Sequence, residues 1–186
     1  MTNEILIAGF GGQGVLSMGK TLAYAGVLRG KEVTWLPSYG PEQRGGTSNV
    51  TVVVSDERIS SPIVDSYDVV IALNQQSLTK FEKRVKPGGT LIYDSYGIQE
   101  RPSRPDINTY SVDATRTANA NHLQKMAGVM VLGAMLGIGH MMDNGDIMAS
   151  LRKTLPERYH NLLPANERAL AMGEAMAVCE HKAANN

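Results

Sequence analysis

The chain has 186 residues, enough to bury the core of one domain, and we expect a single domain over residues 1–186. Its 42% apolar and 19% charged residues are typical of a globular protein and exclude a disordered one. Lys plus Arg and Asp plus Glu balance at 18 each, so no basic excess favours binding to nucleic acid or to a membrane surface. The single cysteine, Cys179, excludes an intrachain disulfide and a four-cysteine zinc or iron–sulfur site in this chain.

The first residues predict no targeting segment. Met1–Glu4 lacks the positive region of a signal peptide, and the apolar run that follows is too short for its core. The most apolar stretch, 127–142, is too short to span a bilayer and predicts a buried helix. The sequence therefore predicts a cytoplasmic protein without a membrane segment.

Short β-rich apolar runs alternate with segments of helical periodicity along the chain. We expect strands over 4–9, 32–36, 49–55, 68–74, 90–94 and 109–113, and helices over 15–28, 75–86, 123–140, 145–155 and 166–182. The first 36 residues form a strand–helix–strand unit. Because 37–48 is barely long enough for a parallel crossover, the third strand should run antiparallel to at least one neighbour. The expected fold is a three-layer α/β sandwich with a mostly parallel, mixed sheet and a C-terminal region that is helical throughout, with Cys179 on its last helix.

A glycine-rich turn follows the first strand. Residues 9–14, Gly-Phe-Gly-Gly-Gln-Gly, fit G-x-G-x-x-G between a strand and a helix. The glycines allow a tight turn and let backbone N–H groups approach a phosphate, while the helix N-terminus adds partial positive charge. The candidate ligand-binding residues here are Gly9, Gly11, Gly12, Gln13 and Gly14. The alternative is a turn whose glycines serve packing only.

Two better-known nucleotide sites fit this segment poorly. A dinucleotide site needs an acid at the end of the second strand, but that strand ends Trp35-Leu36-Pro37. The stretch 14–21 satisfies the P-loop pattern G-x-x-x-x-G-K-[ST], yet it begins well past the strand. Its lysine, Lys20, would then lie inside the helix as a solvated side chain.

A second cluster, Pro37 to Thr47, follows the second strand and is expected at the same sheet edge as the first. It predicts a binding surface, with Arg44 able to clamp a phosphate or carboxylate. The alternative is a Glu42–Arg44 pair that stiffens the loop. The candidate residues in it are Ser38, Tyr39, Gly40, Pro41, Glu42, Arg44, Gly45 and Gly46.

Together the two clusters resemble the gamma subunit of 2-oxoacid:ferredoxin oxidoreductases. The similarity extends through Ser55–Ile63, Ala72-Leu73-Asn74 and Lys86–Tyr93, and covers about residues 4 to 180. The Arg-Gly-Gly-Thr-Ser-Asn segment looks closer to the 2-oxoglutarate and branched-chain 2-oxoacid members than to the pyruvate branch.

The resemblance implies a Rossmann-like subunit of a complex that converts a 2-oxoacid, most simply 2-oxoglutarate, and coenzyme A (CoA) to acyl-CoA, carbon dioxide and reduced ferredoxin. It implies alpha, beta and delta-type partner subunits, which hold thiamine diphosphate and the iron–sulfur clusters, and a gamma chain that is inactive alone. The glycine turn would face the CoA phosphates, Ser38 to Gly46 would line the approach to the thiol, and Asn74 is a weaker candidate. No catalytic residue and no metal site are expected in this chain, whose four histidines are scattered.

The sequence leaves two alternatives open. A stand-alone oxidoreductase that uses NAD or a flavin is the main alternative function. The methionines of the C-terminal helices form either ordinary core or a subunit contact, and core is favoured. They are Met126, Met130, Met135, Met141 and Met142.

Overall fold

The computed structural model describes residues 1–39, 46–139 and 141–183. Its strands are β1 (Thr2–Phe10), β2 (Glu32–Tyr39), β3 (Thr47–Ser55), β4 (Tyr67–Ala72), β5 (Val85–Asp94), β6 (Asn108–Val112) and β7 (Val178–His181). Its α-helices are α1 (Val15–Leu28), α2 (Gln75–Phe81), α3 (Ala114–Ala120), α4 (Ala127–Ile138), α5 (Asn144–Thr154) and α6 (Leu163–Glu174). Short 3-10 turns are η1 (Glu82–Arg84), η2 (Gln124–Met126) and η3 (Glu157–Leu162).

The strands form one mixed sheet in the order β2-β3-β1-β4-β5-β6-β7. Strands β1, β4, β5 and β6 are parallel, whereas β3 pairs antiparallel with both β1 and β2. The antiparallel third strand is therefore confirmed. The strand–helix–strand unit is also confirmed, since β1, α1 and β2 follow one another and β2 runs parallel to β1, but β3 lies between the two strands and pairs with each of them.

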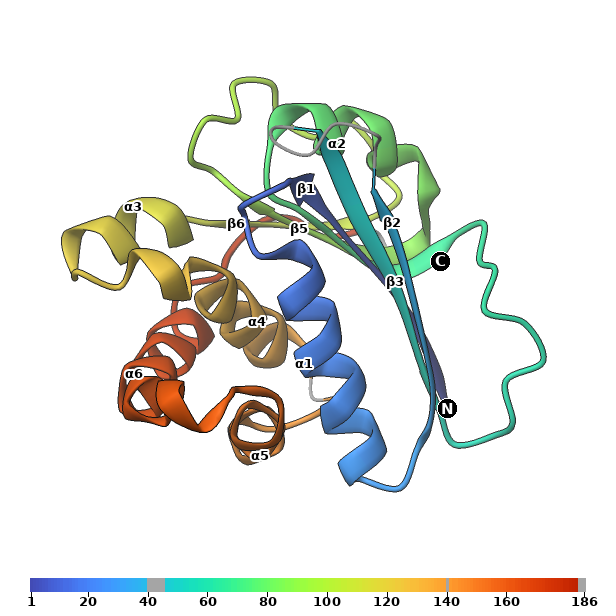
Figure 1. Cartoon of the computed structure of the whole chain (residues 1–186). Coiled ribbons are helices and arrows are strands. Elements are labelled where there is room, and N and C mark those ends of the chain that lie inside the picture. The colour runs from blue at the N-terminus through green and yellow to red at the C-terminus, as the bar shows by residue number, and fades with distance from the viewer. Residues whose placement is uncertain (40–45, 140, 184–186) are drawn as a thin grey trace.

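Helices cover both faces of this sheet, as a three-layer α/β sandwich requires (Figure 1). Helices α1, α4, α5 and α6 lie on one face, where β1 and β3 supply residues such as Ile5 and Val52 to the larger core. Helix α2 lies on the other face over a smaller core that includes Leu6 and Leu91. The alternation of Ile5 and Leu6 between the two cores follows from the period of two in a strand.

Glycines let α4 and α6 pack backbone to backbone. A Cβ built on Gly133 would lie 2.1 Å from Leu170 O, and one on Gly173 only 1.9 Å from Met130 O. Helix α4 is thereby enclosed by the sheet and the other helices, which explains its almost entirely apolar sequence. The methionines named above lie in or against this core, so the core interpretation is confirmed.

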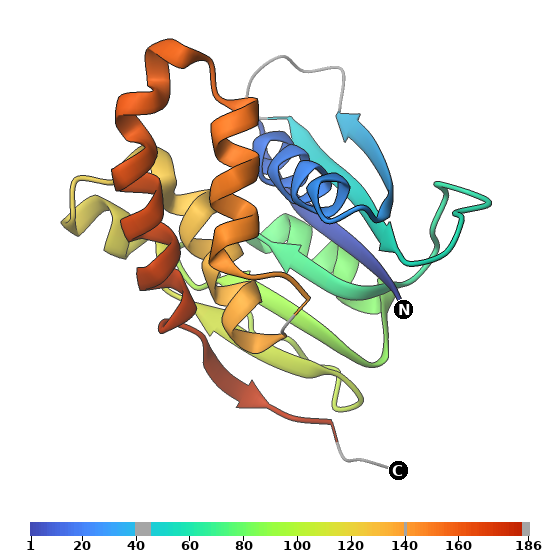
Figure 2. The ribbon, with the colours of Figure 1, turned by 90° about the horizontal axis from the view of Figure 1, so that it is seen from below.

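The end of the chain differs from the prediction of continuous helix. Helix α6 ends at Glu174, and Val178–His181 forms β7, which pairs antiparallel with β6 at the sheet edge (Figure 2). Cys179 is therefore an exposed residue of an edge strand. No Gly or Pro stands between the end of α6 and the start of β7, and the free edge of β6 supplies the backbone partners that a pattern of local residues cannot show.

Two smaller features also differ from the prediction. The helix expected over 75–86 ends earlier, because the chain turns through η1 and enters β5 at Val85. A short helix, α3, follows β6 where none was expected. Among the described residues no helix combines the length and the apolar character needed to cross a membrane.

Candidate functional site

The glycine turn joins β1 to α1 at the carboxyl end of the parallel strands. Strand β1 ends at Phe10, and α1 begins at Val15 with Gly14 as its N-cap residue. Gly12 and Gly14 have φ of 100° and 81°, which only glycine adopts without strain. Within residues 1–39, 46–139 and 141–183 no side chain caps α1, so its first N–H groups have no side-chain acceptor in this part of the chain.

The side chain of Gln13 folds back into the turn. Its Oε1 accepts hydrogen bonds from Phe10 N at 2.7 Å and Asn74 Nδ2 at 3.0 Å, and its Nε2 donates to Leu73 O at 2.8 Å. Asn74 in turn caps α2 by accepting from Ser77 N at 2.8 Å. Both residues were ligand candidates in the sequence, but in the fold their polar groups tie the turn to the end of β4.

The glycines of the turn have different roles. Gly9 is buried, and a Cβ there would lie 2.8 Å from Gln13 Oε1, so this position is required for close packing. The amide of Gly11 donates to Gly46 O at 3.1 Å. A Cβ built on Gly12 or Gly14 meets nothing within 4 Å. Of these candidates, Gly12 and Gly14 therefore have open space beside the backbone.

The second cluster starts on β2 and ends beside the first cluster. Ser38 is exposed near the end of β2, Tyr39 is the last residue of that strand, and Gly46 accepts the hydrogen bond from Gly11. This contact places the two glycine clusters at the same sheet edge, as expected. The candidates Gly40, Pro41, Glu42, Arg44 and Gly45 lie outside the described residues.

A cleft of about 280 Å³, here called the strand-edge cleft, opens next to the turn. It lies at the carboxyl ends of β1, β4 and β5, between the starts of α1, α3 and α4, where ligands bind in open α/β sheets. Its lining residues are Gly12, Gln13, Gly14, Leu73, Asp94, Tyr96, Thr115, Gln124, Lys125, Ala127, Gly128 and Val131.

Lys125 gives this cleft its positive charge. It is exposed in η2, just before α4, and is the one cationic side chain among the described residues that line the cleft. Helix α4 also begins without a side-chain cap. Two helix N-termini and one ammonium group therefore meet in the cleft, which favours an anion. Sequence analysis missed Lys125, because about 110 residues separate it from the glycine motif.

Asp94 also lines the cleft and is almost fully buried. Burial raises the pKa of its carboxyl, while hydrogen bonds from Thr115 and from Tyr96 N act in the other direction. Since Asp94 Oδ2 accepts from the N–H of Thr115, the carboxylate fixes the start of α3. A bound anion is therefore expected near Gly14 and Lys125, away from Asp94.

The two alternative nucleotide motifs find no support in the fold. Lys20 lies inside α1 with its Nζ exposed to solvent, 5.8 Å from the Tyr24 ring, and not in a phosphate-binding loop. Beside β1 the sheet holds antiparallel β3, whose Thr47 pairs with Phe10, in the place where a dinucleotide fold has its acid-bearing second strand. Within the described ranges, no three His, Cys, Asp or Glu residues gather as metal ligands.

Fold and site together define a Rossmann-like α/β domain in which two glycine clusters meet at one sheet edge. The family model described as pyruvate ferredoxin/flavodoxin oxidoreductase matches residues 4–176. The chain belongs to this family, and the resemblance to its gamma subunits is confirmed.

Known relatives agree with this assignment. The ketoisovalerate oxidoreductase subunit VorA of Methanothermobacter thermautotrophicus is 47% identical over 136 residues, which cover 73% of this chain but only 28% of VorA. The 2-oxoglutarate synthase subunit KorC of Methanothermobacter marburgensis is 39% identical over 149 residues, 77% of each chain. The gamma subunit of a keto/oxoacid ferredoxin oxidoreductase from Geobacter sulfurreducens has the same fold, with a TM-score of 0.82. It is 28% identical to this chain, and the match covers 95% of this chain and 96% of that subunit. These relatives are all oxidoreductase subunits.

Proposed function

We propose that this chain is the gamma-type component of a multi-subunit 2-oxoacid:ferredoxin oxidoreductase and that it holds the phosphates of CoA. The complex would convert a 2-oxoacid and CoA to acyl-CoA and carbon dioxide and pass the electrons to ferredoxin. Alpha, beta and delta-type subunits would carry thiamine diphosphate and the iron–sulfur clusters. The names of KorC, VorA and the Geobacter subunit support this role.

One observation carries the CoA proposal: the start of α1, which no described side chain caps, opens into the strand-edge cleft that Lys125 also lines. Gly12 and Gly14 present no side chain there, so a phosphate can approach the N–H groups closely. The ammonium of Lys125 would add a charged contact. CoA fits these features because it carries phosphates. Its binding does not need the acidic residue that a dinucleotide site has at the end of its second strand and that this chain lacks.

The loop from Ser38 to Gly46 is proposed to line the route of the CoA thiol toward the partner subunits. Its end is held against the glycine turn by the bond from Gly11 N to Gly46 O. In this role Arg44 would contact a phosphate or the oxoacid carboxylate. We propose 2-oxoglutarate as the oxoacid, with ketoisovalerate as the branched-chain alternative.

Reconstitution with the partner subunits tests this function. Turnover of 2-oxoglutarate and of ketoisovalerate is followed by ferredoxin reduction, with and without this chain. We expect activity only in the complete complex, and Arg44→Ala should raise the KM for CoA without preventing assembly. Oxoacid turnover by the chain alone would contradict the proposal, and loss of assembly in Arg44→Ala would make the loop an interface.

Direct titration tests the alternative of a stand-alone enzyme that uses NAD or a flavin. The missing acid and the position of β3 beside β1 both count against an NAD site. We expect no bound flavin after purification and no saturable NAD binding at micromolar concentration. A tight NAD complex or a stoichiometric flavin would favour the alternative.

A further inference from the structure

The outer face of α1 carries large apolar side chains where a surface helix normally carries charged ones. Tyr24 is 44% exposed, Val27 56% and Leu28 45%. Val27 and Leu28 follow Tyr24 by three and four residues, so the three side chains share one face of the helix. Lys20 is the only charged residue in the sequence of α1. This helix therefore presents a mainly apolar face to solvent.

Trp35 of strand β2 continues this face. A Cβ built on Gly19 would lie 3.2 Å from Trp35 Nε1, so the indole packs against α1. The ring is nevertheless 41% exposed, because β2 is the edge strand of the described sheet and lies beside α1 (Figure 1). The residues here called the α1 face are Lys20, Tyr24, Val27, Leu28 and Trp35. None of them lines the strand-edge cleft.

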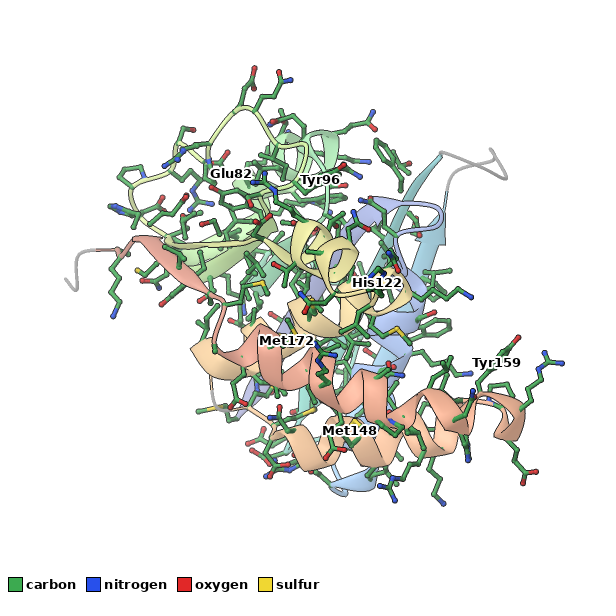
Figure 3. All side chains as sticks on the ribbon, turned by 90° about the vertical axis from the view of Figure 1, so that its left-hand side faces the viewer. Glu82, Tyr96, His122, Met148, Tyr159 and Met172 are labelled. Carbon is green, nitrogen blue, oxygen red and sulfur yellow. The ribbon has the colours of Figure 1, made fainter. Side chains whose placement is uncertain are left out.

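The neighbouring helices have a different surface. On α5 and α6, which face the viewer in Figure 3, exposed positions hold charged residues such as Arg152 and Glu167. Tyr159, 43% exposed at the turn between these helices, lies beside the guanidinium of Arg158, 5.0 Å from the ring centroid. Contiguous exposed apolar patches mark interaction sites, and Tyr and Trp are enriched in protein interfaces. The α1 face therefore has the composition of a protein interface.

Charge favours a different protein over a second copy of this chain as the occupant. A two-fold contact between copies brings the same surface together from both sides. Helix α1 contains no acidic residue, and Glu32 of β2 points to the face opposite Trp35, because side chains alternate along a strand. Lys20 would then meet no carboxylate across a two-fold contact. A partner that is apolar and carries a carboxylate fits the whole face.

The length of a relative indicates which protein this partner is. VorA is matched over only 28% of its length, which leaves 72% of VorA joined to the matching domain in one polypeptide. In the complex proposed above, the present chain is separate from the subunit that corresponds to the rest of VorA. A non-covalent surface then has to do what the covalent link does in VorA.

We propose that the α1 face docks this chain on the partner subunit that corresponds to the part of VorA outside the match. This inference rests on the proposed function and adds the surface through which the chain assembles. Trp35 and Tyr24 are the central anchors, and a carboxylate of the partner pairs with Lys20. The strand-edge cleft lies outside the contact, since the α1 face lines no part of it.

The fluorescence of position 35 tests the contact directly, because Trp35 is the only tryptophan of the chain. It is replaced biosynthetically by 5-hydroxytryptophan, which can be excited apart from the tryptophans of the partner. Acrylamide should quench this fluorescence in the free chain and quench it less after the purified partner subunit is added. Unchanged quenching in a chain that has bound the partner would overturn the inference.

Substitutions at exposed positions give an independent measurement. Val27→Glu and Lys20→Glu should each weaken binding to the partner subunit on the order of tenfold, because the first buries a charge and the second reverses one. Ile63→Glu is the matched control for Val27→Glu, since Ile63 is 75% exposed on the link between β3 and β4. CoA binding by the free variants should stay at the wild-type level and shows that they are folded. Equal affinities of Val27→Glu and Ile63→Glu for the partner would contradict the proposed surface.

The outcomes separate this inference from the proposed function. If the complete complex is active while Val27→Glu and Lys20→Glu bind the partner normally, the docking surface is wrong and the proposed function stands. If the wild-type chain neither binds the partner subunit nor contributes to turnover, both proposals fail. If the chain alone sediments as a dimer that Val27→Glu dissociates, the α1 face binds a second copy and the inference is overturned.

Discussion

Asn74 donates a hydrogen bond to Gln13 Oε1 at 3.0 Å, and this contact joins the end of β4 to the glycine turn after β1. The same Asn74 caps α2, so one side chain links the two strands at the centre of the sheet to a helix on the opposite face. The position of the turn is therefore set by contacts that lie far apart in the sequence.

Gln13→Ala should destabilise the chain. The substitution removes the acceptor for Phe10 N and Asn74 Nδ2 and the donor to Leu73 O. A partly buried polar group that loses its partner costs about 1–3 kcal/mol, and we expect a loss of that order in the free energy of unfolding, measured with urea. Gln124→Ala, at an exposed position of the same cleft, is the control. Equal effects of the two substitutions would mean that the Gln13 contacts contribute little.

Gly173→Ala should separate α4 from α6. A Cβ at this position would lie 1.9 Å from Met130 O, which is backbone and cannot rotate away. Overpacking of this kind typically costs 1–3 kcal/mol or more. Gly139→Ala provides the matched control, since a Cβ there meets nothing within 4 Å. Thermal unfolding should show a clear drop in Tm for the first variant alone, and equal Tm values would contradict the close helix contact.

Lys125→Glu should weaken CoA binding roughly tenfold, because a charged contact to phosphate is replaced by repulsion. The remaining affinity should also depend less on salt concentration. Lys83→Glu, exposed in η1 on the opposite face of the sheet, makes the same charge change away from the cleft. Isothermal titration of the three proteins measures the difference. CoA affinity that falls equally in both variants would indicate a general charge effect and no contact at Lys125.

Tyr93 should make stability depend on alkaline pH. Burial, together with its hydrogen bond to Glu180 at 2.6 Å, raises the pKa of Tyr93 to about 12. Between about pH 10 and 12 the unfolded tyrosine ionises while the folded one keeps its proton, so its contribution to stability is lost as the pH rises through this window. Below pH 10 that contribution is complete.

Urea unfolding of Tyr93→Phe over this pH range checks the prediction. The variant should lose stability less steeply than the wild type between pH 10 and 12. Tyr159→Phe, which removes an exposed tyrosine, should keep the wild-type slope. Glu180 belongs to β7. If stability falls with pH as steeply in Tyr93→Phe as in the wild type, burial and the hydrogen bond to Glu180 do not keep Tyr93 protonated in this pH range.

The sequence by itself determined the local elements of this protein. The spacing of the glycines predicted the turn after β1, and the period of the apolar residues predicted helix α1. The short link before residue 49 predicted that β3 is antiparallel. These features could be predicted because they depend on neighbouring residues. The two glycine clusters also gave the family.

Tertiary structure alone decided the rest. Strand β7 forms because the free edge of β6 is within reach, a fact that no local pattern in 175–182 records. Lys125 and Asp94 meet at the glycine turn only when the helices after β6 return across the sheet. Packing also directs the amide of Gly11 to Gly46, whereas Gly12 and Gly14 keep open space beside the backbone. Sequence specifies backbone preference at each position, but contacts between distant segments decide which polar groups remain free to bind.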